Sequence, residues 1–216
     1  MLKLKHGILI AIEGIDGSGK STLAKNLYTL LQEKKYQTVL TKEPGGTALG
    51  QQLRNIVQEK KVPVCSQAEF LLFATDRAQH FHELVIPQLN AGALIISDRM
   101  SDSSLVYQGF GRGLDTHQIQ AINSWAMHGK KPDITFYIKV TIQTATARIK
   151  ARNEALTSFE KEKQDFIQKL IEGFDALYKN RNDVIIIDGN QTEEYVTTQA
   201  LTALITWITQ NQLILP

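Results

Sequence analysis

The 216-residue sequence predicts an α/β fold in which helices cover both faces of a parallel sheet. Short apolar runs alternate with segments of helical periodicity, as in successive strand–helix–strand units. The apolar runs are nearly continuous, which is typical of strands that are buried on both sides. The length suits one domain and no linker or internal repeat interrupts the alternation, so we predict a single unit over residues 1–216.

Apolar runs bounded by polar or glycine-containing segments predict the strands of a five-stranded sheet. The predicted strands lie, in order, at 7–12, 37–41, 94–98, 134–138 and 184–187. The first run resembles the apolar part of a signal peptide, but it is short, ends at Glu13 and is followed by no small-residue cleavage pattern. We therefore interpret it as a buried strand.

Helical periodicity accounts for the segments between the strands. The predicted helices lie at 20–34, 48–59, 66–90, 115–127, 142–152, 160–179 and 192–209. The first helix has an apolar face made of Leu23, Leu27, Leu30 and Leu31. The third is expected to bend near Pro87, because proline has no backbone N–H to donate. The polar stretch 153–163 is either a mobile lid or the solvated face of a helix.

Composition and charge exclude several classes of function. Apolar residues make up 43% and charged residues 21% of the chain, as in an ordinary globular protein. A net charge of +2 argues against a nucleic-acid groove or an anionic membrane surface, so we expect neither partner. No apolar run reaches the roughly 20 residues of a membrane span. The single cysteine, Cys65, excludes an intrachain disulfide and favours a reducing compartment, so we predict a cytoplasmic location.

The segment between the first strand and the first helix matches a phosphate-binding loop. Gly14–Ser21 has the pattern G-x-x-x-x-G-K-[ST] in the required context. Its glycines let successive N–H groups point at a phosphate, and the following helix adds its positive end. Lys20 supplies a cation and the Ser21 hydroxyl can bind Mg²⁺. We therefore predict the three-layer P-loop NTPase fold and a nucleoside triphosphate site at Gly14, Ile15, Asp16, Gly17, Ser18, Gly19, Lys20, Ser21 and Thr22.

Charged residues follow the other predicted strands. The carboxyl ends of parallel strands line one crevice, so we expect four side chains to converge there: Asp16, Glu43, Asp98 and Arg99. A carboxylate in this crevice can hold Mg²⁺ or its waters, which makes Asp98 a second candidate metal ligand beside Ser21. An arginine there can bind a second phosphate. The alternative for Asp98-Arg99 is a surface ion pair.

Four further segments carry sequence motifs in a fixed order behind this loop. They are Glu43–Thr47 (EPGGT), Leu72–Arg77 (LFATDR), Asp98-Arg99 and Ser104–Gly109 (SLVYQG), with Gly111-Arg112-Gly113 following. Together they resemble the bacterial thymidylate kinase family, which transfers the γ-phosphoryl group of ATP to dTMP, and the resemblance covers nearly the whole chain. It implies a nucleoside monophosphate kinase that uses ATP and Mg²⁺ and forms a homodimer.

The resemblance also implies roles for single residues. Phe73 would stack on the thymine ring and Arg77 would contact the base or the monophosphate, although the residues alone also allow a core phenylalanine and a surface arginine. Arg99 would bind the acceptor phosphate and Asp16 the 3′-hydroxyl. The remaining implied contacts are Ser104 and Gln108 with the base edge, Tyr107 with the sugar, Pro44 in the EPGGT loop, Glu43 and Asp98 near the metal and phosphates, and Gln191 at the adenine.

The chain departs from the family pattern in the lid. Bacterial members carry an arginine in a stretch that resembles LDRxE, whereas Leu156–Glu160 reads LTSFE and the phosphate-binding loop has no arginine either. Arg148 and Arg152 lie four residues apart on the preceding helix. We hypothesise that Arg152, with Arg148, supplies the missing charge; the alternative is that both only solvate a helix. The predicted catalytic residues are Lys20, Asp16, Arg99 and Arg152.

No general base is predicted, because the acceptor is already an anionic phosphate oxygen. Lys42 stands where the family often has arginine, so a bidentate phosphate contact is not available there. Two alternatives stay open: a kinase for another pyrimidine monophosphate such as dUMP, and a nucleotide-binding protein with impaired catalysis. A GTP-dependent switch would need an Asn-Lys-x-Asp segment after a strand, which the sequence lacks.

Overall fold

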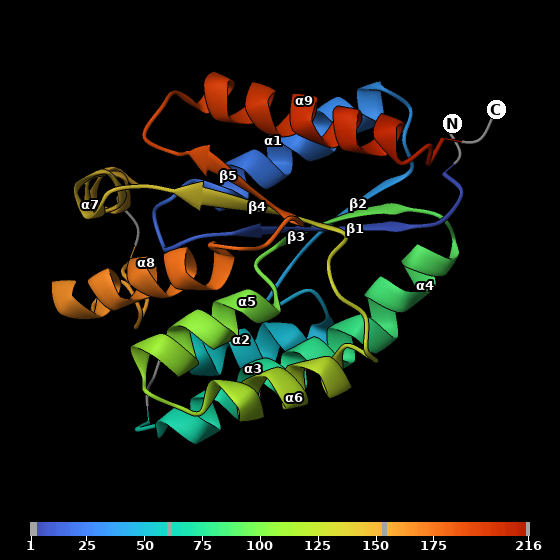
Figure 1. Cartoon of the computed structure of the whole chain (residues 1–216). Helices are drawn as coiled ribbons and strands as arrows, with labels where there is room; N and C mark the ends of the chain where they lie inside the picture. Colours follow the sequence, from blue (N-terminus) through green and yellow to red (C-terminus); the bar gives the residue numbers. More distant parts are fainter. Residues whose placement is uncertain (1–3, 60–61, 153–154, 215–216) are drawn as a thin grey trace.

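The computed structural model describes residues 4–59, 62–152 and 155–214. Within these residues the centre is a five-stranded parallel sheet with the order β2-β3-β1-β4-β5. The strands are β1 (Ile8–Glu13), β2 (Thr38–Lys42), β3 (Leu94–Asp98), β4 (Ile134–Lys139) and β5 (Val184–Asp188). Helices lie on both faces of this sheet (Figure 1), which confirms the predicted fold class.

The central strand β1 shows why the apolar runs are continuous. All of its residues are buried, and successive side chains point to opposite faces of the sheet. Ile8, Ile10 and Ile12 belong to the larger core cluster. Leu9 and Ala11 belong to a second cluster on the other face. Burial on both faces therefore removes the polar alternation that a half-exposed strand would show.

Two helices form the layer on one face of the sheet. They are α1 (Lys20–Glu33) and α9 (Glu193–Gln210), which lie together above the strands in Figure 1. Leu23, Leu27 and Leu31 of the predicted apolar face of α1 are buried, whereas Leu30 is partly exposed. The opposite layer in Figure 1 contains α2 (Ala48–Glu59), α3 (Ser66–His80), α4 (Ile86–Asn90), α5 (Ser101–Ser104), α6 (Thr116–Ala126) and α8 (Gln164–Tyr178).

The segment predicted as one helix over 66–90 contains a wider turn. A π-helical turn, Phe81–Val85, separates α3 from α4, and Pro87 stands in the first turn of α4. Proline has no N–H to donate and its ring conflicts with the carbonyl four residues earlier, so a regular helix is disfavoured at this point. The irregularity expected near Pro87 is therefore a π-helical turn just before it.

A second π-helical segment, Leu105–Gly111, follows α5 and was not predicted as a regular element. Its two glycines, Gly109 and Gly111, weaken the helical signal in the sequence. It packs closely on α8, where a Cβ added at Gly111 would lie 2.7 Å from the Phe166 ring. Ser104, the last residue of α5, directly precedes this segment and Tyr107 lies within it, so the segment orients part of the predicted acceptor site.

The lid region differs from its predicted boundaries. The helix expected to begin at residue 160 begins at Gln164, as α8. Residues 153–154 of the expected lid lie outside the described residues, and 158–161 form a turn. Just before this turn the Thr157 N–H donates to a carboxylate oxygen of Glu160 at 2.8 Å. The other predicted elements match within two residues at each end, including α7 (Ile142–Ala151). Among the described helices, none has the length and apolar character that crossing a bilayer requires.

The packing of α8 on the π-helical segment gives a stability prediction for Gly173→Ala. The added Cβ would lie 2.9 Å from the Cβ of Phe110, which is fixed to the backbone. Alanine is favoured over glycine in a helix by about 1 kcal/mol, but overpacking costs about 1–3 kcal/mol. We expect the free energy of unfolding in urea to fall by about 1 kcal/mol, whereas exposed Lys169→Ala should change it by less than about 0.5 kcal/mol. A more stable Gly173→Ala variant would contradict this packing.

Candidate active site

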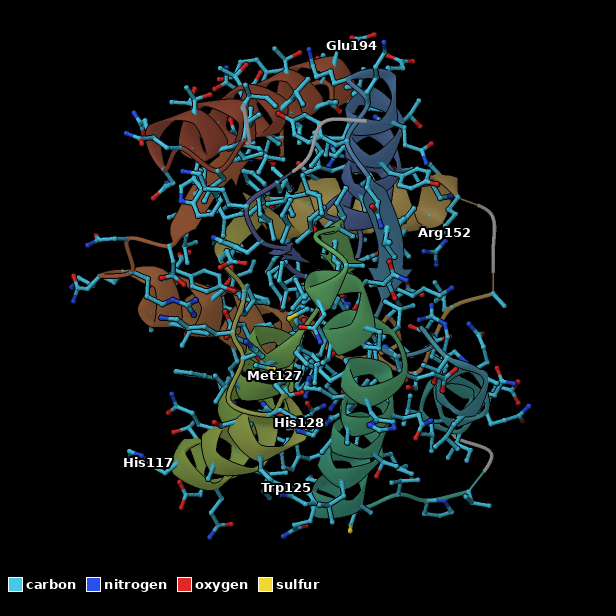
Figure 2. All side chains as sticks on the ribbon, turned by 90° about the vertical axis from the view of Figure 1, so that its right-hand side faces the viewer. His117, Trp125, Met127, His128, Arg152 and Glu194 are labelled. Carbon is cyan, nitrogen blue, oxygen red and sulfur yellow. The ribbon has the colours of Figure 1, made fainter. Side chains whose placement is uncertain are left out.

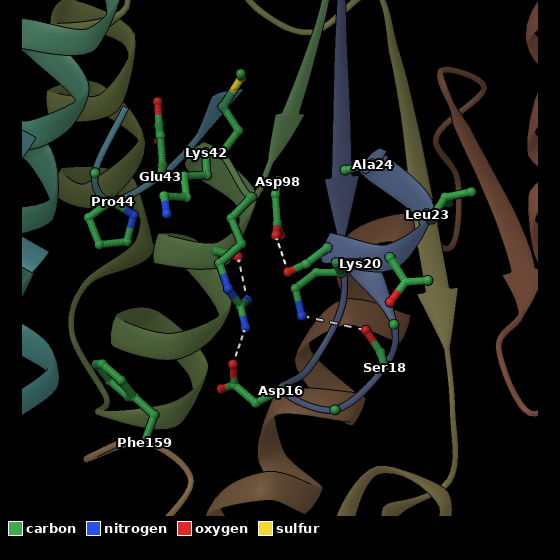
Figure 3. A pocket seen from close by; sticks show the side chains of 18 of the residues that line it. Asp16, Ser18, Lys20, Leu23, Ala24, Lys42, Glu43, Pro44, Asp98 and Phe159 are labelled. Carbon is green, nitrogen blue, oxygen red and sulfur yellow. Dashed lines mark hydrogen bonds and ion pairs between the residues drawn. The ribbon is translucent and has the colours of Figure 1, made fainter. Parts of the chain in front are cut away.

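A cavity of about 1010 Å³ opens at the carboxyl edge of the sheet (Figure 3). Its lining brings together nearly all of the predicted site residues: Asp16, Gly17, Ser18, Gly19, Lys20, Ser21, Thr22, Glu43, Pro44, Phe73, Arg77, Asp98, Arg99, Ser104, Tyr107, Gln108, Arg148, Arg152 and Gln191. Gly14 and Ile15 do not line it, because they are buried in the first turn of the loop. One cavity therefore receives side chains from widely separated parts of the chain.

The loop after β1 curls around the amino group of Lys20. Gly17 and Gly19 have φ angles of 79° and 101°, in the left-handed region that favours glycine. A Cβ at Gly17 would also lie 2.5 Å from the carbonyl oxygen of Ala145, so the loop packs directly on α7. Lys20 Nζ donates to the Ile15 carbonyl at 2.7 Å and lies 3.5 Å from Ser18 Oγ.

Burial, followed by the neighbouring Arg99 charge, lowers the pKa of Lys20 from 10.5 to about 8. The nearby carboxylates of Asp16, Asp98 and Glu13 act in the opposite direction. A partly desolvated ammonium group is strongly attracted to an entering polyanion, which would raise the pKa of Lys20 again. The site is therefore suited to phosphate before any phosphate is present.

Arg99 joins the phosphate-binding loop to the end of β3. Its Nη2 lies 2.5 Å from Asp16 Oδ1 and donates to the Tyr107 hydroxyl at 3.1 Å. The Tyr107 hydroxyl in turn donates to Asp16 Oδ2 at 2.9 Å, and the guanidinium lies 5.0 Å from the centre of the Tyr107 ring. Although burial opposes it, the charges of Arg99 and Lys20 and the Tyr107 hydrogen bond keep the pKa of Asp16 below its usual value. The three side chains form one interlocked cluster.

Two side chains with oxygen atoms that could bind a metal ion, Ser21 and Asp98, lie together beside the phosphate-binding loop. The Ser21 hydroxyl donates to the Asp98 carboxylate, and both face the cavity. Mg²⁺ prefers oxygen ligands and is commonly bound by one or two side chains together with phosphates and waters. Within the described residues no cluster of three or more His, Cys, Asp or Glu side chains could hold a metal by itself. The chemistry of Ser21 and Asp98 therefore fits Mg²⁺ that arrives with a polyphosphate.

A second buried charge cluster fixes Arg77. This side chain is 1% exposed, which excludes the surface arginine considered from the sequence. Arg77 Nε donates to Glu43 Oε2 at 2.8 Å, and Nη1 donates to Asn123 Oδ1 at 2.6 Å and to Ser104 Oγ at 3.1 Å. Arg77 is thus held from three neighbouring segments with its guanidinium at the cavity wall.

Glu43 has a different environment from the one expected for a residue near metal and phosphates. Its Oε2 is bound by Arg77, and its Oε1 lies 3.0 Å from His80 Nδ1. His80 is fully buried and its other ring nitrogen lies 2.7 Å from Thr41 Oγ1. Burial acts to raise the pKa of Glu43, but Arg77 and His80 bring it below 4.5. Both carboxylate oxygens of Glu43 are thus bonded to buried neighbours, and we predict that Glu43 orients Arg77.

Aromatic side chains form the acceptor side of the cavity. Phe73 is half-buried and lines the cavity, so it is not a core phenylalanine. Phe159 of the lid lies nearby, with its ring centre 6.0 Å from that of Phe73 and 5.7 Å from that of Tyr107. Gln108 is 1% exposed and donates to Glu69 at 3.0 Å. The apolar faces and these polar groups together make a pocket suited to a planar base.

The two lid-side arginines have different contacts. Arg148 donates to the carbonyl oxygens of Ser18 at 3.2 Å and Gln191 at 3.4 Å, so it bridges the loop and the segment after β5. Arg152 Nη2 lies 2.9 and 3.0 Å from the carboxylate oxygens of Glu160. Both arginines line the cavity, and Arg152 is also exposed to solvent.

The lid is attached to the end of α2. Ser158 Oγ donates to the Val57 carbonyl at 2.9 Å, and its N–H donates to the Gln58 carbonyl at 3.1 Å. Thr157 and Ser158 stand where the family has Asp-Arg, and here they build the turn and its attachment. The neighbouring Phe159 and Glu160 are thereby directed into the cavity.

Several residues of the site were missed by the sequence analysis. Arg54 lines the cavity and donates to the Pro44 carbonyl at 3.0 Å, and Ser103 and Phe159 also line it. Glu13 is fully buried beside Ser103. The available signal for Glu13 was a charged residue at the end of an apolar strand. Arg54, Ser103 and Phe159 follow no spacing that marks them, because only the folded chain brings them to the cavity.

A model of the thymidylate kinase family matches residues 12–200. The chain belongs to the thymidylate kinase family. It is 39% identical over 191 residues to the thymidylate kinase of Carboxydothermus hydrogenoformans and 35% identical over 193 residues to that of Halothermothrix orenii. Each alignment covers 88% of this chain and 93% of the relative. The crystal structure of thymidylate kinase from Ehrlichia chaffeensis superimposes with a TM-score of 0.74 at 31% identity, covering 92% of this chain and 98% of the other.

Family membership confirms the resemblance that the four motifs indicated. The family is one of ATP-using phosphotransferases, so the predicted enzyme class is confirmed as well. The similarity extends over nearly the full length of the relatives. The matched residues include the phosphate-binding loop, the four motif segments and α7, the helix that leads into the lid.

The buried position of Glu43 predicts a large effect of Glu43→Gln on stability. The change leaves the buried Arg77 charge uncompensated, so we expect the free energy of unfolding at pH 7 to fall by about 3 kcal/mol. The pKa of Glu43 is lowered in the folded state, so its stabilisation is present above about pH 4.5 and is lost as the pH falls through the folded pKa. The difference between wild type and variant in urea unfolding should therefore shrink in acid.

Glu194→Gln is the matched control, because Glu194 is exposed at the start of α9 (Figure 2). It should change the free energy of unfolding by no more than about 0.5 kcal/mol. If Glu43→Gln keeps wild-type stability and loses only turnover, the orienting role is wrong and Glu43 acts on the reacting groups.

Proposed function

We propose that the protein phosphorylates dTMP, transferring the γ-phosphoryl group of ATP to a phosphate oxygen of dTMP to give dTDP and ADP. Membership of the thymidylate kinase family supports this reaction. The observation that carries it is the single cavity into which a triphosphate loop and an aromatic, arginine-containing pocket both open. In the transfer, a P–O bond forms to the acceptor phosphate and the P–O bond to the ADP leaving group breaks.

The donor half binds ATP. The inward N–H groups of the loop and the N-terminus of α1 would hold the β- and γ-phosphates, and Lys20 would neutralise their charge. Arg148 bonds to the Ser18 and Gln191 carbonyls, so it would fix the loop against the segment that borders adenine. Bound Mg²⁺ would be held by Ser21 and Asp98 and would offset negative charge on the phosphates.

The acceptor half binds dTMP. Phe73 would offer its face to the thymine ring, and Arg77 and Ser104, which are already hydrogen-bonded to each other, would contact the base edge. Gln108 lines the same wall. Tyr107 would pack against the sugar and disfavour a 2′-hydroxyl, and Asp16 would accept from the 3′-hydroxyl. Glu43 contributes by holding Arg77 rather than by direct contact with the metal.

Arg99 would bind the acceptor phosphate and bring it in line with the γ-phosphoryl group. It stands at the end of β3 between Asp16 and Tyr107, so its position is defined before either substrate enters. The transferred group spreads charge over its oxygens, and fixed cations stabilise this charge without reorganisation. The acceptor oxygen is an anion, so the reaction needs positioning rather than a general base.

Arg152 is the proposed lid cation. Glu160 holds it from the lid, and Ser158 attaches the lid to α2. With Phe159 on the acceptor side and Arg152 on the donor side, the short lid segment would contact both halves of the site.

A coupled assay of ADP formation tests the proposed reaction. Wild type should form ADP rapidly with dTMP and only slowly without it, and dUMP, dCMP and dGMP should react more slowly. Lys20→Ala should lower kcat at least about a hundredfold, because it removes a charge that stabilises the transferred group. Faster turnover of another monophosphate would contradict the substrate, and ADP formation independent of any acceptor would contradict a kinase.

The role of the lid cation predicts a large effect of Arg152→Ala. We expect kcat to fall at least about a hundredfold with little change in KM for dTMP, because the charge acts mainly in the transition state. Glu160→Gln should lower kcat less, and the double variant should be no slower than Arg152→Ala, because Glu160 acts through Arg152. Lys150→Ala, on an exposed position of α7, is the control and should keep wild-type kcat. An unchanged kcat in Arg152→Ala removes it from this role.

We further propose that the chain forms a homodimer as a single domain. Trp125 on α6 is 80% exposed and Leu71 on the adjoining α3 is 51% exposed, which supports an interface on this layer. Figure 2 shows Trp125 and His128 near each other at the opposite end of the view from Glu194. The dimer and the cytoplasmic location stay predictions.

A further inference from the structure

We propose that Glu13 is a positioning residue that fixes Arg99 for the acceptor phosphate, acting through Ser103 and the turn after β3. This inference rests on the proposed role of Arg99 in binding dTMP. Neither the phosphate-binding loop nor the acceptor motifs include Glu13 or Ser103, so their contribution would be additional to those motifs.

Glu13 is a fully buried acid whose side-chain hydrogen bonds go to Met100 and Ser103, in the segment that follows Arg99. It is the last residue of β1, and its side chain is 0% exposed. Oε1 accepts from the Met100 N–H at 2.8 Å and the Ser103 N–H at 3.2 Å. Oε2 accepts from Ser103 Oγ at 2.6 Å. A carboxylate is costly to bury, and here it binds three donors of the segment that directly follows Arg99.

The backbone of Arg99 needs such support. Its φ is 71°, in the left-handed region, which a non-glycine residue adopts only when its surroundings hold it there. The Arg99 N–H donates to the Ile12 carbonyl at 3.0 Å, and the next N–H, that of Met100, donates to Glu13. Two adjacent residues of β1 therefore hold the two sides of this backbone turn.

The side chain of Arg99 is linked to the same carboxylate. Its Nη1 donates to Ser103 Oγ at 3.0 Å and to the Gly14 carbonyl at 3.0 Å. Because the Ser103 hydroxyl hydrogen is directed to Glu13, the lone pairs of its oxygen are available to Arg99. These bonds occupy Nη1, whereas Nη2 lies at Asp16 and Tyr107. Glu13 thus acts through Ser103 on one of the four contacts that fix the orientation of the guanidinium.

Protonation of Glu13 would weaken this arrangement. Burial, and then the charge of Asp102, raises the pKa of Glu13 to about 7, against the opposing effects of Ser103, Arg99 and Met100. Lys20 and Tyr178 are the other titratable groups that interact with it. A neutral carboxyl group carries a proton on one oxygen and competes for Ser103 Oγ as a donor. Acceptor affinity should therefore decrease as the pH falls through about 7.

The test compares dTMP binding in Glu13→Gln and Ser103→Ala with wild type by calorimetry at pH 8. Each variant should raise Kd for dTMP about tenfold and leave Kd for ATP within about twofold, since one charge-assisted contact of Arg99 is lost. In an Arg99→Ala background, Glu13→Gln should have no further effect on Kd for dTMP. From pH 8 to 6.5, Kd should rise more steeply in wild type than in Glu13→Gln, in which only the ligand phosphate titrates.

Asp102→Asn is the matched control. Asp102 is a buried acid next to Ser103, but it bonds to Tyr178 and Arg181 rather than to Arg99. This variant should lower Tm and keep Kd for dTMP within about twofold of wild type. If Glu13→Gln does not fold, Ser103→Ala carries the test.

Three results would overturn the positioning role. The first is an equal loss of dTMP and ATP binding in the variants, and the second is unchanged dTMP binding with a lower Tm. The third is an effect of Glu13→Gln on Kd for dTMP that is as large in the Arg99→Ala background as in wild type. Failure of the proposed function is a separate result, since wild type would then bind no dTMP.

Discussion

The ion pair between Asp16 and Arg99 connects the two halves of the site. Asp16 lies in the loop after β1, and Arg99 lies in the turn after β3. The strands are parallel neighbours, with Ile12 paired to Asp98, so the segments that follow them begin side by side. The charges are partly removed from water and must be compensated locally. Their pairing, shared with Tyr107, holds the loop after β1 and the segment after β3 in a fixed relation.

A second cluster of buried charges, at the cavity wall formed by Arg77, is also compensated locally. Arg77, Glu43 and His80 come from α3 and the end of β2, and each is buried. A buried arginine needs an acid nearby to compensate its charge, and Glu43 is that acid for Arg77. A site that must align two anions gains from cations whose positions are already set, because little reorganisation remains for the transfer step.

The lid shows how this chain accommodates a departure from its family. Thr157 and Ser158 form a turn and its attachment to α2, in place of the Asp-Arg pair of the family pattern. The turn places Phe159 against the aromatic acceptor wall and Glu160 against Arg152. In the proposed mechanism the cation that the lid lacks would be Arg152, at the end of α7 and next to the phosphate-binding loop.

The sequence by itself determined the alternation of strands and helices and the phosphate-binding loop, because both depend on contiguous residues. The phosphate-binding loop depends on local backbone geometry, so the spacing of its glycines, Lys20 and Ser21 is enough to identify it. Only the tertiary structure decided the partners of the buried acids. Glu13 meets Ser103 across 90 positions and Glu43 meets Arg77 across 34, and no local pattern encodes such pairings. Packing against other layers also decided the two π-helical turns, since local propensity favours regular helix or loop there.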